Sequence, residues 1–178
     1  FRVDAEGVNA DSFRCQQEGD CLVIREDWPE LADDSLALIL RSAGYSPKVI
    51  ITVPQGIVLE EVELNLLAGE LRLCDLEADA VELNMAAGAL YGASLRAQDM
   101  ALQISAGSAE FQALTGEEAQ LALTMAELEI EQADMDHVSL SVSGGLLTAG
   151  ALEFQELDAD CAAGEIDLGL VPPERDCR

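Results

Sequence analysis

The sequence predicts an all-β solenoid, in which one chain winds into stacked coils of equal length. Three observations lead to this prediction: a glycine period, an alternation of apolar residues, and a repeat that continues without a gap. A fixed period of about 20 residues is the signature of a stacked repeat. Here glycine recurs at every nineteenth position, with Ala126 in the one slot that it misses, and the glycines are Gly69, Gly88, Gly107, Gly145 and Gly164.

Six consecutive segments follow this period, and we call them coils 1 to 6. They are residues 58–76, 77–95, 96–114, 115–133, 134–152 and 153–171. The residues at their seventh positions are Leu64, Leu83, Leu102, Leu121, Leu140 and Ala159. The fifth and ninth positions are also apolar, and polar residues stand between them. Such alternation is typical of a β-strand, so we reject a helical alternative, which coil 4 alone would favour on propensity.

A second apolar run follows the glycine slot, at the fourteenth, sixteenth and nineteenth positions of each coil. Each coil is therefore expected to carry two inward-facing runs, with glycine at the bend because it accepts a positive φ. One coil cannot bury its own apolar row, so equivalent residues should stack about 4.8 Å apart. This parity places Phe111 inward and Tyr91 outward. Cys161 falls in the inward ninth column and is expected in the core.

Residues 1–57 do not follow the period and are expected to form short strands separated by turns. The expected strands are 1–3, 12–15, 21–25, 35–40 and 48–53, with turns at 16–20, near 28–29 and at 44–47. We predict that residues 1–57 cap the solenoid of residues 58–171 and that residues 172–178 form a tail, in one cooperative domain. Pro172 and Pro173 stop further strand pairing because proline donates no hydrogen bond.

The five cysteines form no C-x-x-C pair, and the chain has one histidine, so no zinc site is expected. Cys15 and Cys21 flank the turn expected at 16–20 and share strand parity. A disulfide between them is one interpretation, and two small buried residues is the other. The odd number of cysteines predicts at least one free thiol in a monomer.

The charge is strongly negative, with 35 Asp and Glu against 9 Lys and Arg, a net charge of −26. The six coils hold 23 acidic residues and only Arg72 and Arg96 as bases. Such a field repels phosphates and anionic lipids, which excludes a nucleic-acid partner. We interpret the acidic residues as a solvated surface whose charge discourages solenoids from stacking on one another.

Calcium binding is the more specific interpretation of the acidic residues, because carboxylates are ligands that calcium prefers. The two acidic groupings that suggest it are Asp134 with Asp136, and Glu153 with Glu156, Asp158 and Asp160. Solenoid calcium sites repeat Gly-Gly-x-Gly-x-Asp in every coil, and this repeat is missing here. We therefore predict no metal and no cofactor.

No catalytic residue is predicted either. His137 stands in an acidic corner and is interpreted as solvated, not as a general base. Arg72 and Arg96 fall at different positions of their coils, so they do not share a row that could stabilise a transition state. The alternating glutamates of 127–131 should form one solvated strand face and not a glycosidase pair. The motifs of serine hydrolases, zinc proteases and phosphate loops are also missing from the sequence.

The run KVIITVPQGI at 48–57, followed by VELNLLAGELRL and VELNMAAGALYG, resembles a bacterial adhesin family of unknown function. It is also similar to the related head domain of auto-transporter adhesins. The shared features, over residues 35–171, are a strand that ends in P-x-G and coils punctuated by glycine. The resemblance implies a single-stranded parallel β-solenoid, or β-helix, that is right-handed and lies on the outer face of a cell envelope. It supplies no catalytic residues.

The expected function is that of a non-enzymatic cell-envelope or extracellular adhesin, a monomer that presents an acidic surface to a protein or surface ligand. The chain has no run of 18 apolar residues and begins at Phe1, so any signal or membrane anchor is expected in an upstream segment. Two alternatives remain open. One is an extracytoplasmic sensory or regulatory domain of a membrane-anchored protein, and the other is a carbohydrate-active β-helix enzyme.

Overall fold

The computed structural model of the chain describes residues 2–6, 13–18, 21–26, 48–52, 56–66 and 69–170. These fall into two compact units, Phe1–Ile57 and Val58–Arg178, and each is described by itself. Within the described ranges, no helix is long and apolar enough to cross a membrane. Whether the first unit caps the second stays a prediction.

The first unit contains two antiparallel strand pairs. Strand β1 (Arg2–Glu6) pairs with β4 (Lys48–Thr52), and β2 (Phe13–Glu18) pairs with β3 (Cys21–Glu26). Strands therefore occur at four of the five expected places, with bounds shifted by a few residues. The strand expected at 35–40 and the turns near 28–29 and at 44–47 lie outside the described residues.

The register of the β2–β3 hairpin contradicts the facing arrangement of Cys15 and Cys21. Cys15 pairs with Ile24, and Cys21 pairs with Glu18. The two cysteines are thus three residues out of register, which separates their Cα atoms by about 10 Å along the strands. A disulfide needs Cα atoms within about 7 Å. The expectation was wrong because the strands continue to Glu18 and Cys21, which leaves a connection shorter than the turn predicted at 16–20.

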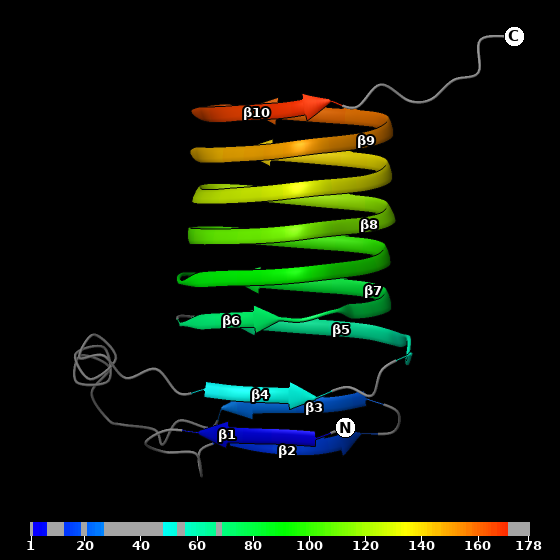
Figure 1. The fold of residues 1–178 in the computed structure, drawn as a ribbon. Coiled ribbons are helices and arrows are strands. Elements are labelled where there is room, and N and C mark those ends of the chain that lie inside the picture. Colours follow the sequence, from blue (N-terminus) through cyan, green and yellow to red (C-terminus); the bar gives the residue numbers. More distant parts are fainter. Residues whose placement is uncertain are drawn as a thin grey trace, which may run out of the picture. The chain divides into compact units, whose positions relative to one another are not determined.

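The second unit is a single-stranded parallel β-solenoid of six coils (Figure 1). Its strands are β5 (Leu59–Leu66), β6 (Glu70–Leu73), β7 (Leu76–Met85), β8 (Ala89–Val142), β9 (Gly145–Cys161) and β10 (Gly164–Leu170). Every pairing between them is parallel, and partners stand one full period apart up to Leu168, as in Leu64 with Leu83 and Leu83 with Leu102. The predicted architecture and its period are confirmed.

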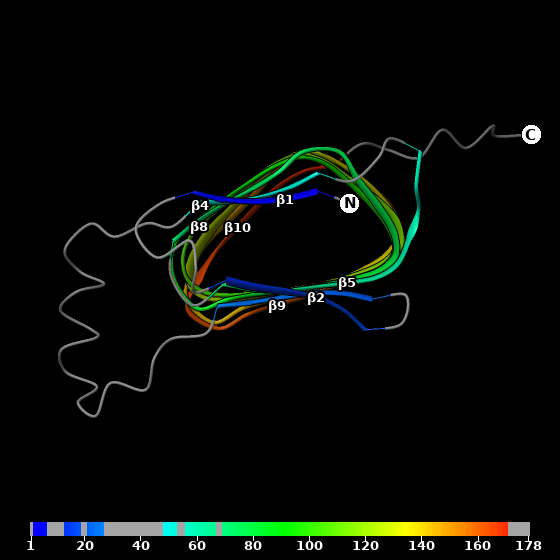
Figure 2. The same cartoon turned by 90° about the horizontal axis from the view of Figure 1, so that it is seen from below.

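The solenoid is right-handed. In Figure 1 the chain rises from β5 to β10 while the front strands β6 and β10 both run from left to right. Figure 2 looks along the axis and shows the coils superimposed in one flattened outline, as a constant register between coils requires.

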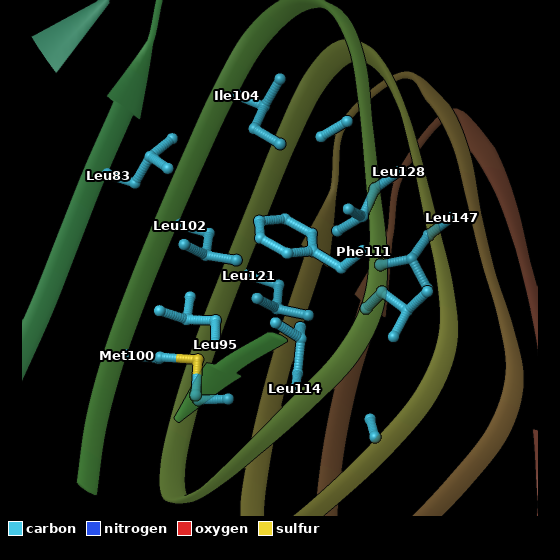
Figure 3. Close-up of a cluster of buried hydrophobic side chains, with 14 of the residues drawn as sticks. Leu83, Leu95, Met100, Leu102, Ile104, Phe111, Leu114, Leu121, Leu128 and Leu147 are labelled. Carbon is cyan, nitrogen blue, oxygen red and sulfur yellow. The ribbon is translucent and has the colours of Figure 1, made fainter. Parts of the chain in front are cut away.

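The core lies inside the coils and is built from the predicted columns. Leu83 and Leu102 are fully buried in the seventh column, and Phe111 is buried in the sixteenth. Figure 3 shows these side chains pointing into the shared interior. The second position of each coil, which includes Ala97 and Met135, is a further inward column that the sequence analysis did not identify. No polar or charged side chain is buried in the described part of the chain.

Neighbouring coils compensate for one another in side-chain size. Gly92 and Phe111 occupy the sixteenth column of adjacent coils, and a Cβ added to Gly92 would lie 2.3 Å from the Phe111 ring. The missing side chain at Gly92 therefore makes room for the largest residue of the column. Because interiors pack as densely as organic crystals, a large residue in one coil requires a small one beside it.

Glycine at the corner meets two requirements at once. Gly88, Gly107 and Gly145 have φ values of 132°, 110° and 118°, which favour glycine. A Cβ on Gly107 would also lie 2.0 Å from the carbonyl oxygen of Gly88 in the coil before it. That carbonyl accepts a hydrogen bond from the Ser108 amide at 3.0 Å. The bend predicted at this slot is confirmed for these coils, but Gly164 in coil 6 is not among the glycines with positive φ.

Cys161 is exposed, so its predicted place in the core was wrong. It does occupy the ninth column, in register with Val142, which is 1% exposed. The difference arises because coil 6 is the terminal coil, and the part of the chain that the structure describes supplies no further coil to cover it. Column identity predicted the direction of the side chain, but burial requires a neighbour on both sides.

Candidate functional site

The outward columns of the solenoid carry the titratable side chains and form the candidate site. Strand alternation turns every residue between two core positions toward solvent. The constant register then stacks carboxylates of neighbouring coils, as in Glu63 with Glu82 and Asp134 with Glu153. Like charges directly opposite one another on a sheet are destabilising, so the neighbours of these carboxylates matter.

Amide side chains lie beside the first of these pairs. Asn65 donates to Glu63 Oε1 at 2.6 Å, and Asn84 donates to Glu82 Oε1 at 2.8 Å. Asn84 also donates to Asn65 Oδ1 at 3.2 Å and so connects the two coils. These amides donate hydrogen bonds to exposed carboxylates of successive coils, which offsets part of the repulsion between the two negative charges.

Arg72 forms a separate cluster on the other outward face. Its Nε lies 2.5 Å from Glu70 Oε1, and its guanidinium carbon lies 5.3 Å from the centre of the Tyr91 ring in the next coil. The hydrogen bond to Glu70 and its negative charge raise the pKa of the Arg72 guanidinium. Tyr91 points outward, as predicted. Arg72 is in register with Tyr91 and Arg96 with Glu77, so the two arginines do not share a row, as predicted.

His137 belongs to a cluster that joins coils 5 and 6. Its Nδ1 lies 3.3 Å from Glu156 Oε2, and both side chains are more than half exposed. One column away, Gln155 donates a hydrogen bond to Asp136. The pair is open to solvent, and no arginine from the described coils stands beside it. The arrangement is an exposed contact between an imidazole and a carboxylate of neighbouring coils.

The described coils contain an open groove on the surface and a small cavity inside. One open groove crosses the corners of coils 3 to 6 and is lined by Thr115, Gln132, Asp134, Ala151 and Glu153, among others. Inside the core, a small apolar cavity lies among coils 3 to 6, bordered by Ala119 and Ala133. It is about large enough for one water molecule and has no polar lining, so it offers nothing to a ligand.

Comparison with models of protein families identifies the family of this chain. A family model for Toastrack DUF4097 matches residues 30–174. The chain belongs to the Toastrack family. This is a β-solenoid-like family of unknown function, and it does not itself carry an adhesin assignment. A search of curated proteins and a search of solved structures found no match.

The acidic groupings considered for calcium meet only as the pair Asp134 and Glu153 in this Toastrack solenoid. Asp158 and Asp160 are in register with Ser139 and Ser141, so they extend along one strand. Residues two apart on a strand are separated by about 6.6 Å, which spreads their carboxylates. Among the residues that the structure describes, no group of three or more His, Cys, Asp or Glu side chains could hold a metal ion.

The contacts between coils were missed by sequence reasoning, although a signal for them exists. His137 with Glu156 and Asp136 with Gln155 each stand one period apart, as do Asn65 and Asn84. Writing the Toastrack coils beneath one another places each pair in one column. The same alignment that identified the core columns therefore predicts surface partners when it is read for polar residues.

Proposed function

We propose that this Toastrack solenoid is a non-enzymatic binding protein of the cell envelope, which presents its acidic outward columns to a cationic protein or surface. The observation that carries the proposal is the excess of acid on the outside of every coil. The coils hold 23 acidic residues against Arg72 and Arg96, and the described solenoid buries none of their charges.

The spacing of the coils makes these charges act together. Successive coils are about 4.8 Å apart, which is shorter than the screening length of about 8 Å at physiological ionic strength. A partner that approaches the surface therefore meets the summed potential of several carboxylates. Summed fields of this kind attract cationic partners and raise their rate of association.

The exposed and dispersed polar groups favour binding over catalysis. Catalytic carboxylates and bases usually have shifted pKa values in a pocket that excludes water. Here His137 and Glu156 are more than half exposed, and the groove lined by Asp134 and Glu153 is open to solvent. The location in the cell envelope rests on the sequence resemblance to the adhesin family, and we propose that an upstream segment supplies any membrane anchor.

Binding to surfaces of defined charge tests this function. The purified protein should bind immobilised polylysine and vesicles that contain a cationic lipid, and should not bind phosphatidylserine vesicles. Binding should disappear by about 0.5 M salt, where the screening length falls to a few ångströms. Failure to bind polylysine at low salt would contradict the proposal, as would binding that is unchanged at high salt.

A variant separates charge from shape in the same assay. Replacing Glu127, Glu129 and Glu131 by Gln removes three charges from one exposed strand face without changing side-chain size. Its affinity for polylysine should fall while its melting temperature stays close to that of the wild type. Equal affinity of variant and wild type would show that this face takes no part in binding.

A further inference from the structure

The end of the solenoid at coil 6 leaves core columns uncovered. Ala159 and Cys161 are exposed, although Leu140 and Val142 beneath them are 3% and 1% exposed. Leu170, close to the end of the coil, is 56% exposed. The inward face that each earlier coil buries under its successor is therefore presented to solvent here.

Among the described residues, no strand pairs with the outer edge of coil 6. Residues 153–161 pair with β8, and β10 pairs with β9, so the described strands cover one edge only. At the corners, Leu66, Leu123 and Val142 carbonyls accept hydrogen bonds from amides of the next coil, at 2.8 to 2.9 Å. By the same register, the Cys161 carbonyl can accept a hydrogen bond from a backbone amide of a strand added at this edge. An exposed edge of this kind is a template for strand addition.

The charge of coil 6 limits what can occupy the edge. The coil carries six acidic residues and no base: Glu153, Glu156, Asp158, Asp160, Glu165 and Asp167. A second copy stacked by the same coil would place acid against acid. Pro172 and Pro173 have no amide hydrogen for a ladder, so the sequence that directly follows coil 6 disfavours a seventh coil.

We propose that the outer edge of coil 6 is a docking site for an extended segment of a partner protein in which apolar and basic residues alternate. The segment adds as a further strand: its apolar residues cover Leu157, Ala159 and Cys161, and its basic residues lie over the carboxylates of the same coil. This inference rests on the proposed function, and it names the part of the acidic surface that recognises a partner.

The peptide KFQKLKAKV tests the edge directly. It repeats residues 153–161 with lysine at the outward acidic positions and valine in place of Cys161, so it would extend the columns in register. Two control peptides carry the same charge: KKKKFQLAV, which lacks the alternation, and an N-methylated form of the first, which lacks donors. The first peptide should bind the protein, and both controls should bind about tenfold more weakly because they cannot complete the strand.

Matched protein variants locate the binding. Replacing Glu156, Asp158 and Asp160 by Gln, Asn and Asn should weaken binding of the peptide about tenfold through loss of facing charge. The variant with Gln at 127, 129 and 131 loses the same charge elsewhere and should stay within about twofold, because charges beyond a screening length contribute little. When the peptide is added, hydrogen exchange should slow at the amides of residues 153–161 that do not donate to coil 5, and it should stay unchanged in β10.

Three results would overturn the proposal. Equal binding of all three peptides would mean that the acidic surface attracts any cation, in which case the proposed function stands and the docking edge does not. Equal weakening by both variants would have the same meaning. Slow exchange before peptide is added, at the amides of 153–161 that do not donate to coil 5, would show that a second copy or residues 171–178 already cover the edge. Absence of binding to polylysine as well would instead contradict the proposed function.

Discussion

Replacing Gly107 by Ala tests the structural basis of the corner. Gly107 has φ 110° and its added Cβ would lie 2.0 Å from Gly88 O and 2.8 Å from Gly88 N, both backbone atoms that cannot rotate away. Gly69 offers a matched control at the same slot. Its φ is 134°, but the nearest atom to an added Cβ is Leu66 Cδ1 at 3.9 Å, because coil 1 has no coil before it in the solenoid.

The two substitutions separate the cost of an unfavourable φ from the cost of a clash with the coil before. At Gly69 only the unfavourable φ is introduced, which destabilises by about 1–2 kcal/mol. At Gly107 the corner must also move by about 1 Å, and the hydrogen bond from Ser108 to Gly88 O at 3.0 Å is lost or bent. An unmade buried hydrogen bond costs about 1–3 kcal/mol, so G107A should destabilise by about 2–5 kcal/mol in total.

Urea unfolding followed by far-ultraviolet circular dichroism measures both variants, with hydrogen exchange as a local readout because repeat proteins can open coil by coil. G107A should be more destabilised than G69A by about 1–3 kcal/mol, with fastest exchange at the corners of coils 2 and 3. Equal destabilisation by the two substitutions would refute the argument that the coil beneath requires glycine.

Three further substitutions probe the core. L102A, at a fully buried position, should lower the free energy of unfolding by about 2–5 kcal/mol. Q103A, at the neighbouring outward position, should change the free energy of unfolding by less than about 0.5 kcal/mol. Similar losses for the two variants in urea unfolding would mean that the column of Leu102 is not interior. G92A should destabilise by about 1–3 kcal/mol through overlap with the Phe111 ring, and a double-mutant cycle with F111L should recover part of the loss; additive effects would show that the two sites do not touch. A119V introduces, beside the apolar cavity, the valine that other coils have at this position. It should raise the melting temperature and add up to about 1 kcal/mol to the free energy of unfolding. A lower melting temperature would show that the cavity cannot accept the added methyl groups.

The sequence predicts the solenoid well because each coil repeats the same physical constraint. Leu64, Leu83 and Leu102 pair in register as expected, because stacked coils bury one column only when the period is constant. The positive φ at Gly107 was predicted for the same reason. These features are visible in one chain, since the repeat serves as its own alignment.

Features that depend on ends or on register were harder to predict. Cys161 has the column of a core residue but lies in the last coil, and a column pattern does not show what covers its end. The pairing of Cys15 with Ile24 depends on the length of one turn, and a single-residue change in that length reverses strand parity. The polar pair of His137 and Glu156 was visible in the repeat, but one sequence does not show which outward residues interact.

Distances between spin labels on different coils test the central claim, that coils of equal length stack in register into one column with acids outside. Labels replace Glu82 and Asp158, which share an outward column four coils apart, in a background without native cysteines. The account predicts a separation of about 19 Å, and about 5 Å less when Ser139 replaces Asp158 as the second site. A separation above about 30 Å, more than six strand spacings, would contradict it.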